Sequence, residues 1–259
     1  MTSRPPRSRP VAPSPAPARS RPLAPSPVLG RDGSLPQGDA KHDAVEGMFD
    51  RLAPRYDRMN RIISLGMDKG WRRRTVDALA AVAGGTVLDL ACGTGDLCRD
   101  LAARGYTPIG VDFSAGMLAA AQVDAALVRG DGAALPFASA SADGLTCGFA
   151  LRNFVDLDAV FAECARALRA GGRFAALDAA VPTNPFMRAG NAVWFRGAVP
   201  LLGRVVAHDA EAYRYLPKST AYLPSAPELQ DRLRAAGFRD VRHTTLTGGS
   251  VLLLTGTRG

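Results

Sequence analysis

The chain has 259 residues, 47% of them hydrophobic and 22% charged, which is an ordinary composition for a globular domain with a buried core. Seven basic and two acidic residues give residues 1–41 a net charge of +5 out of a total of +8, so the charge belongs to one terminal segment and gives little support to a nucleic-acid-binding domain. The four cysteines form no CxxC pair and the three histidines are well separated, so the sequence predicts neither a disulfide framework nor a metal site.

Residues 1–41 also hold ten of the nineteen prolines and are predicted to be a disordered tail rich in proline and arginine. An organelle-targeting peptide is the less favoured alternative, because the frequent prolines prevent the amphipathic helix that such peptides form. No stretch of about 18 uninterrupted apolar residues follows, so no membrane-spanning helix is predicted. We therefore expect one ordered domain over residues 42–259, with an N-terminal helical cap at 43–80 and a lid insertion at 182–224.

Hydrophobic periodicity after the tail predicts alternating helices and strands. The expected helices are residues 43–53, 68–79, 96–103, 115–122, 157–168 and 226–236, with the glycine pairs 84–85 and 171–172 ending two of them. The expected strands are residues 86–90, 107–111, 125–128, 144–151, 173–180, 239–246 and 250–257, the last two forming a hairpin. This alternation predicts an α/β fold, a doubly wound, mostly parallel seven-stranded sheet with a C-terminal antiparallel hairpin.

A glycine-rich turn follows the first predicted strand, in the run Val87-Leu-Asp89-Leu-Ala91-Cys-Gly93-Thr-Gly95-Asp96. The strand delivers Asp89 to the carboxyl edge of the sheet, where open α/β sheets bind their ligands. Gly93 and Gly95 lack a Cβ, so the backbone from Ala91 onward can pass close to a bound molecule. A dinucleotide site is the weaker alternative, because the third glycine of its fingerprint is replaced by Cys98. The cationic methionine end of S-adenosylmethionine gains from a nearby carboxylate, which favours a class I S-adenosylmethionine methyltransferase.

Acidic residues also follow the second and third predicted strands. Asp112 ends the second strand, where a carboxylate can accept hydrogen bonds from both ribose hydroxyls of a nucleoside. Met117 is placed to flank the adenine, and Asp131, with Gly132 beside it, can accept from the adenine amino group. A single aspartate at a strand end is more often a turn or a helix cap. Three acids after three successive strands favour the cofactor site.

Three further segments carry a more specific pattern. They are Tyr56-Asp-Arg-Met-Asn60 with Trp71-Arg-Arg-Arg-Thr75, Gly148-Phe-Ala-Leu-Arg152-Asn153, and Asp209-Ala-Glu-Ala-Tyr213-Arg-Tyr215-Leu-Pro217-Lys-Ser219. Together they resemble the ubiquinone/menaquinone biosynthesis C-methyltransferase family over residues 44–258. The chain departs from that family at Asp68, where a histidine is usual, and at Asp178-Ala179-Ala180, where Glu-Phe-Ser is expected. Asp178 keeps the negative charge of the glutamate but has a shorter reach.

The resemblance implies C-methylation of a polyprenylated hydroquinone by S-adenosyl-L-methionine, with demethylmenaquinol favoured and a ubiquinol precursor left open. It implies catalytic roles for Arg152, Asp209 and Tyr213, and substrate-binding roles for Tyr56, Asn60, Asn153 and Tyr215. Arg152 can stabilise phenolate charge beside the donor methyl, and a salt bridge to a surface acid is the alternative. Asp209 and Tyr213 can bind or activate the quinol oxygen, and anchoring of a lid is the alternative for the tyrosine.

The insertion at 182–224 carries apolar residues and arginines, among them Phe186, Arg188 and Trp194. It can line a path for the prenyl tail or rest on an anionic membrane surface, and a helix packed on the sheet with extended arginines fits equally well. The expected partner is the polyprenyl hydroquinone, in a cytoplasmic enzyme for which peripheral contact with the inner face of the membrane is left open.

Other functions compete with this one. A methyltransferase with a different phenolic acceptor is the alternative that Asp178-Ala179-Ala180 motivates. A nucleic-acid methyltransferase or binding module is weaker, because the turn after the fourth strand lacks the Asn/Asp-Pro-Pro-aromatic run used for amino groups of bases, so no specific nucleic acid is expected. A non-catalytic cofactor-binding partner of a quinone-synthesis assembly is the third alternative. No oligomeric state follows from the sequence.

Overall fold

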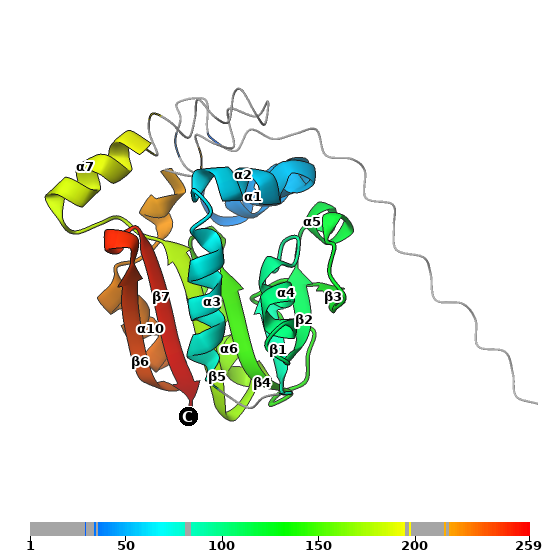
Figure 1. Ribbon diagram of the computed structural model, residues 1–259. Coiled ribbons are helices and arrows are strands. Elements are labelled where there is room, and N and C mark those ends of the chain that lie inside the picture. Colours follow the sequence, from blue (N-terminus) through cyan, green and yellow to red (C-terminus); the bar gives the residue numbers. More distant parts are fainter. Residues whose placement is uncertain are drawn as a thin grey trace, which may run out of the picture.

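Helices and strands alternate along the described part of the chain. The computed structural model describes residues 29, 34, 36–80, 84–194, 197, 215 and 218–259. Its strands are β1 (Thr86–Leu90), β2 (Thr107–Asp112), β3 (Ala126–Arg129), β4 (Ala142–Gly148), β5 (Leu168–Ala179), β6 (Phe238–Leu246) and β7 (Val251–Arg258). Its helices are α1 (Gly38–Leu52), α2 (Tyr56–Ile63), α3 (Asp68–Leu79), α4 (Asp96–Ala102), α5 (Ala115–Ala120), α6 (Leu157–Ala167), α7 (Pro185–Val193) and α10 (Ala226–Ala235). Four 3-10 helices join them: η1 (Ala53–Arg55), η2 (Leu151–Asn153), η5 (Thr220–Tyr222) and η6 (Thr247–Gly249) (Figure 1).

The seven strands form a single sheet in the order β3-β2-β1-β4-β5-β7-β6. Strands β1 to β5 pair in parallel, and β7 pairs antiparallel with both β5 and β6. The predicted fold class is confirmed, with the antiparallel strand lying next to the edge strand β6. The strand order reverses between β1 and β4, and open α/β sheets bind ligands at the carboxyl ends of the strands beside such a point.

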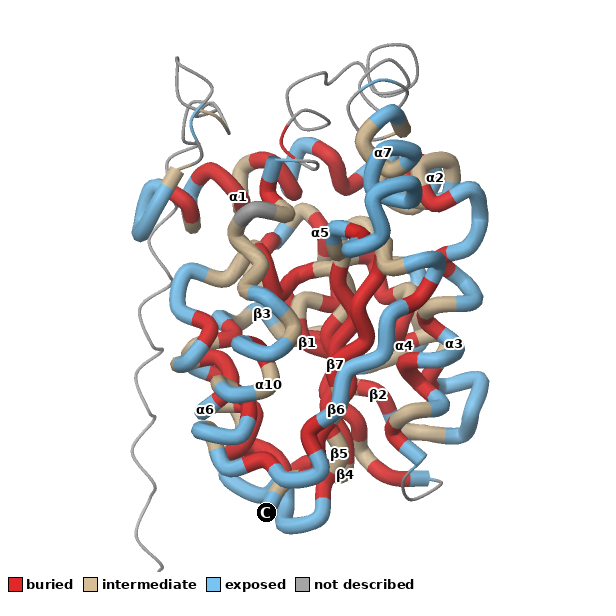
Figure 2. The backbone as a smooth tube through the Cα atoms, turned by 90° about the vertical axis from the view of Figure 1, so that its left-hand side faces the viewer, coloured by how far each residue is buried: buried red, intermediate tan, exposed pale blue. Residues whose placement is uncertain are grey.

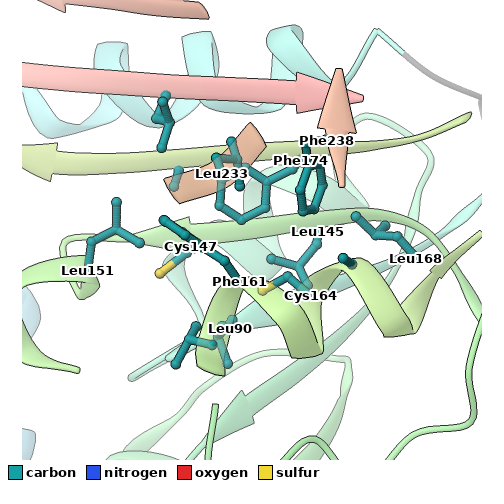
Figure 3. Packing of buried hydrophobic residues seen from close by; sticks show 14 of the residues in the cluster. Leu90, Leu145, Cys147, Leu151, Phe161, Cys164, Leu168, Phe174, Leu233 and Phe238 are labelled. Carbon is teal, nitrogen blue, oxygen red and sulfur yellow. The ribbon is translucent and has the colours of Figure 1, made fainter. Parts of the chain in front are cut away.

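The core lies on both faces of the sheet, because successive side chains of a strand point to opposite faces. In β5, Phe174 packs with Phe161 of α6 and Leu233 of α10, whereas Leu177 packs on the face covered by α3 and α4. Figure 3 shows the first of these clusters, in which the Phe161 and Phe174 rings meet edge to face at 5.8 Å. The strands are mainly buried and the outer faces of the helices exposed (Figure 2).

An N-terminal cap formed by α1, η1 and α2 lies across one end of the sheet (Figure 1). Helix α1 begins at Gly38 rather than at residue 43, so the expected tail boundary at residue 41 is wrong for residues 38–41. Lys41, expected in the tail, is buried: Nζ donates to the Phe154 carbonyl at 2.7 Å and lies 3.9 Å from the centroid of the Tyr222 ring. A lysine that counts as tail charge in the sequence therefore joins the cap to the domain.

Several predicted boundaries and helix ends differ from the structure. Helix α3 ends at Leu79 as predicted, but its C-cap is Ala80 in the left-handed conformation rather than the glycine pair that was expected to end it. Strand β5 begins at Leu168, directly after α6, because Leu168 is buried and pairs with Ala142 of β4. The pair Gly171-Gly172 therefore lies inside the strand, where the positive φ of Gly171 accompanies a shift in register. Strand β4 ends at Gly148, and the last residues of the predicted strand turn into η2.

Within the described residues, no helix combines the length and the apolar character needed to cross a bilayer. The same residues contain no group of His, Cys, Asp and Glu side chains arranged to hold a metal ion.

Candidate active site

Two cavities meet under the cap, at the carboxyl edge of the sheet. The smaller has a volume of about 140 Å³ and the larger a volume of about 380 Å³. The residues that line both are Phe49, Tyr56, Ala91, Gly93, Gly148 and Phe149. They come from α1, α2, the turn after β1 and the end of β4, so this junction lies at the point where the strand order reverses. Two molecules that occupy the two cavities meet there.

The smaller cavity collects the residues predicted to bind a nucleoside, namely Asp112, Met117, Asp131 and Gly132. Oδ2 of Asp112 accepts a hydrogen bond from the Gly93 N–H at 2.8 Å, and Oδ1 accepts one from the Ser114 N–H at 2.9 Å. A carboxylate has about four lone-pair positions, so two remain for the hydroxyls of a ribose. Burial raises the pKa of the Asp112 carboxyl, and the backbone N–H groups of Ser114 and Gly93 oppose that rise.

The remaining wall of the smaller cavity combines an apolar slot with a carboxylate at its rim. Met117 is buried in the first turn of α5. Asp131 is exposed and its Oδ1 accepts from the Ala133 N–H at 2.9 Å. A Cβ at Gly132 would lie 2.9 Å from Cε1 of Phe154, so only glycine lets the backbone pass this ring. The slot suits a flat heterocycle that carries an amino group.

The turn after β1 is left-handed at Ala91, Gly93 and Gly95, with φ of 53°, 55° and 86°. Ala91 and Gly93 line both cavities. Gly95 lines neither cavity, because it is the N-cap of α4, and a Cβ there would meet Cγ1 of Val123 at 2.7 Å. Gly95 therefore shapes the turn, and Ala91 and Gly93 form the surface that a ligand would meet.

Asp89 is fully buried beneath this turn. Its Oδ1 accepts from the Thr146 hydroxyl at 2.8 Å, and its Oδ2 accepts from the Cys98 thiol at 3.4 Å. Burial raises the pKa of the Asp89 carboxyl to about 7, against the opposing effect of the Thr146 and Cys98 hydrogen bonds. Asp89 lines the larger cavity, yet both of its oxygens are engaged within the protein. Asp89 can therefore act on a ligand through its charge when it is ionised, rather than through a direct hydrogen bond.

Arg152 lines the larger cavity and is buried in an ion pair with Asp178 of β5. Its Nη1 also donates to the Phe149 carbonyl at 2.7 Å, and its Nε donates to the Ser219 hydroxyl at 3.1 Å. The backbone N–H of Arg152 donates to Oδ2 of Asp178 at 3.0 Å. A salt bridge was the alternative to a catalytic role, but its partner is a buried carboxylate rather than a surface acid. The ion pair fixes the guanidinium on the cavity wall, so pairing with Asp178 is compatible with the predicted catalytic role of Arg152.

The four residues predicted to bind substrate form two pairs. Tyr56 and Asn60 lie one helical turn apart on α2, with Tyr56 at the junction and Asn60 on the larger cavity. The Tyr215 hydroxyl donates to Oδ1 of Asn153 at 3.2 Å. Asn153 lines the smaller cavity, whereas Tyr215 is fully buried and lines neither. Tyr215 therefore holds Asn153 in place. Asp209 and Tyr213 lie outside the described residues.

Two carboxylates of the cap hold the loops around the smaller cavity, and no sequence argument assigned them. Asp57 accepts from the Thr94 hydroxyl in the turn after β1. Oδ1 of Asp50 accepts from the Ser114 hydroxyl at 2.5 Å and from the Gly116 N–H at 2.9 Å, after β2. Asp57 lies inside the motif Tyr56–Asn60, but no motif in the neighbouring sequence indicates a role for Asp50. We call Lys41, Asp50 and Asp57 the cap anchors.

A buried network lies beside the larger cavity. Asp68 accepts from the Ser64 hydroxyl at 2.7 Å and pairs with Nη1 of Arg72 at 2.6 Å. Arg72 also pairs with Asp96 at 2.9 Å and with Asp100 at 2.7 Å, both on α4. The aspartate that replaces the expected histidine at position 68 is therefore committed to joining α3 to α4.

Comparisons with known proteins agree with this geometry. Residues 37–258 match the ubiE/COQ5 methyltransferase family. The demethylmenaquinone methyltransferase of Roseiflexus sp. (strain RS-1) is 42% identical, covering 86% of this chain and 96% of that protein. The ubiquinone/menaquinone biosynthesis C-methyltransferase UbiE of Syntrophotalea carbinolica is 37% identical, covering 82% of this chain and 92% of that protein.

Solved structures share the fold at low sequence identity. A SAM-dependent methyltransferase from Aquifex aeolicus gives a TM-score of 0.57 at 13% identity, covering 78% of this chain and 98% of that chain. Haemonchus contortus phosphoethanolamine N-methyltransferase 2, in complex with S-adenosyl-L-methionine, gives 0.56 at 14% identity, covering 82% of this chain and 56% of that chain.

Proposed function

Because this chain belongs to the ubiE/COQ5 methyltransferase family, we propose that it transfers a methyl group from S-adenosylmethionine to a ring carbon of a polyprenylated hydroquinone, with demethylmenaquinol as the acceptor. The relatives named as demethylmenaquinone methyltransferases support this choice of head group. The observation that carries the proposal is the junction of the two cavities at Gly93 and Phe149. A nucleoside in the smaller cavity and an aromatic ring in the larger one meet at that point.

The residues of the smaller cavity fit the cofactor by their chemistry. The two remaining acceptor positions of Asp112 suit the ribose hydroxyls, and Asp131 suits the adenine amino group. Tyr56 covers the turn, since its Cε1 lies 3.8 Å from where a Cβ of Gly93 would be. When bound, the cofactor supplies an electrophilic methyl group on a cationic sulfur. In its ionised form the buried Asp89 favours a cation in this place, and a bound cation in turn favours the ionised form.

The larger cavity meets the requirements of the acceptor. A ring carbon becomes a good nucleophile when the adjacent hydroxyl loses its proton, and the fixed guanidinium of Arg152 stabilises the resulting phenolate. Asp178 and Ser219 hold that guanidinium in position. The cap excludes water from the junction, so the ring carbon and the methyl group are held together away from solvent. The sulfur–methyl bond would break as the carbon–carbon bond forms, leaving S-adenosylhomocysteine, and the ring proton would pass to solvent at the cavity mouth, which restores aromaticity.

An apolar rim marks the mouth of the larger cavity. Four of the seven exposed large hydrophobic residues in the described ranges line the larger cavity and form this rim: Leu65, Met67, Phe186 and Met187. Phe186 is 85% exposed, and both Leu65 and Phe186 line the cavity. The prenyl tail would leave the cavity through the rim, and the same side chains would insert into the surface of a bilayer. The proposed partner is thus a lipid-borne hydroquinone, reached by peripheral contact with the membrane.

A methyl-transfer assay on both reduced head groups tests the proposed function. We expect turnover with demethylmenaquinol, and we expect Asp112→Ala to raise the KM for the cofactor about tenfold or more while the KM for the acceptor stays unchanged. Asp231→Ala, an exposed position on α10, is the matched control. Bound cofactor with no transfer to either head group would contradict the proposal. Transfer to another phenol would then establish the alternative acceptor that Asp178-Ala179-Ala180 suggests.

A further inference from the structure

One wall of the larger cavity is aromatic, and no role in binding the acceptor has been assigned to it above. Trp71 lies in the first turn of α3, and Phe149 follows β4. Their ring centroids are 6.1 Å apart and their planes are inclined at 60°, an arrangement typical of favourable aromatic pairs. Both line the larger cavity, and Phe149 also lines the smaller one. The wall therefore ends at the junction where the methyl group must be transferred.

The indole of Trp71 is fixed in one orientation. Its Nε1–H donates to the Thr247 hydroxyl at 2.8 Å, and Thr247 belongs to the η6 turn between β6 and β7. The indole also packs against the buried cluster that α3 and α4 form with the sheet. An indole whose N–H is satisfied and whose edge is packed presents a constant apolar face to the cavity.

Backbone strain is concentrated around the same cavity. Seven non-glycine residues in the described ranges have a positive φ, and four of them line the larger cavity: Leu65, Ala91, Phe149 and Thr247. A positive φ is most unfavourable for a β-branched residue such as Thr247, whose φ is 49°. Such strain persists only where contacts enforce it, and it gathers at functional sites. Here the Trp71 indole holds Thr247, and the Arg152 guanidinium holds the Phe149 carbonyl at 2.7 Å.

We propose that Trp71 and Phe149 form the binding wall for the aromatic ring of the acceptor, and that Thr247 is the positioning residue that fixes Trp71. This inference rests on the proposed function and names the part of the site that receives the head group. A flat apolar ring on this wall has one edge at the junction, and its prenyl tail points toward the apolar rim. A two-ring naphthoquinol covers more of the indole than a one-ring benzoquinol does, so the wall favours the two-ring head group.

Tryptophan fluorescence reads this contact directly, without turnover. The chain has two tryptophans, and Trp194→Phe leaves Trp71 as the single emitter. The variant, with S-adenosylhomocysteine present, is titrated with 1,4-dihydroxynaphthalene, a head group without a tail, and then with 1,4-dihydroxybenzene. We expect saturable quenching of Trp71 by the two-ring compound and binding about tenfold weaker by the one-ring compound. Quenching that does not saturate, or equal affinity for the two compounds, would contradict the proposal that Trp71 and Phe149 bind the ring.

Steady-state kinetics separates positioning from general structural damage. Trp71→Leu and the milder Thr247→Val should raise the KM for the acceptor about tenfold and leave the KM for the cofactor unchanged, and Thr247→Ser should restore it. Tyr106→Leu is the matched control, since Tyr106 packs against the same buried cluster and lines neither cavity. An equal loss in the control would overturn the proposal. A wild-type enzyme that transfers no methyl group would instead contradict the proposed function. The fluorescence titration would still show whether Trp71 and Phe149 bind the ring.

Discussion

Arg152 and Asp178 form a buried ion pair, and in the proposed function Arg152 also has a catalytic task. Removing one partner leaves a buried charge uncompensated, so Asp178→Ala should lower the free energy of unfolding by about 3–5 kcal/mol in urea denaturation. Replacing both residues with leucine removes both charges and should recover most of that loss. The double variant should nevertheless have lost most of its kcat. If it kept the wild-type kcat, Arg152 would have no part in the chemistry.

Asp89 makes stability depend on pH. Burial raises the pKa of its carboxyl from an ordinary 3.8 to about 7 in the folded protein. The stabilising contribution of this protonated carboxyl is complete below pH 3.8, decreases between the two values, and is lost as the pH rises through 7. The melting temperature of the wild type should therefore fall between pH 5 and pH 8, and Asp89→Asn should reduce that fall. A fall of equal size in the variant would show that other groups cause it.

At the level of helices and strands, the sequence predicts those features that depend on neighbouring residues. The sequence pattern identified β1 and α3 at their observed bounds. Strand β1 is a short apolar run that is buried on both faces of the sheet, and α3 buries one face. The strand ends then identified Asp112 and Asp131, since parallel strands bring their carboxyl ends to one edge. The cap anchors could not be found in this way. Asp50 contacts Ser114 across 64 residues of chain, and nothing in the neighbouring sequence records that contact.

The cap anchors give the cap a measurable effect on cofactor affinity. Asp50→Ala removes the acceptor for the Ser114 hydroxyl and the Gly116 N–H, so the loop that carries Asp112 and Met117 loses its support. We expect the Kd of the cofactor in calorimetry to rise about tenfold, while the Kd of a head-group analogue stays unchanged. Asp43→Ala, also on α1 but exposed to solvent, is the matched control. Equal Kd values in the two variants would contradict the assignment.

Helix α7 carries Phe186 and Met187 of the apolar rim, and this predicts binding to vesicles. Phe186→Ser should weaken partition onto vesicles that contain anionic lipid about tenfold, because the exposed ring no longer leaves water on contact. Val155→Ser removes an exposed apolar side chain outside the rim and should leave partition unchanged. If both variants bound vesicles like the wild type, the rim would have no contact with the membrane.

As a whole, the molecule has three layers, a single sheet with helices on both of its faces, and the two cavities lie between the sheet edge and the cap (Figure 1). The fold class followed from the sequence because it depends on the order of helices and strands alone. The division into two cavities did not, since it depends on where α1, α2 and α7 lie over the edge. In the proposed function, the same division separates the cofactor from the acceptor. The smaller cavity is lined by His42 and Val45 of α1, and the larger cavity is lined in part by residues of α7.

The cap anchors also bear on the timing of catalysis. Lys41, Asp50 and Asp57 bind segments that follow η2, β2 and β1. We therefore expect that release of the spent cofactor requires several hydrogen bonds to break together. Departure of S-adenosylhomocysteine would then limit the steady-state rate, and rapid mixing should reveal a burst in the first turnover. Loosening the cap with Asp50→Ala should remove the burst and raise the rate at saturating cofactor. Such a cap would lower the turnover rate and, by the same contacts, raise the affinity for the methyl donor.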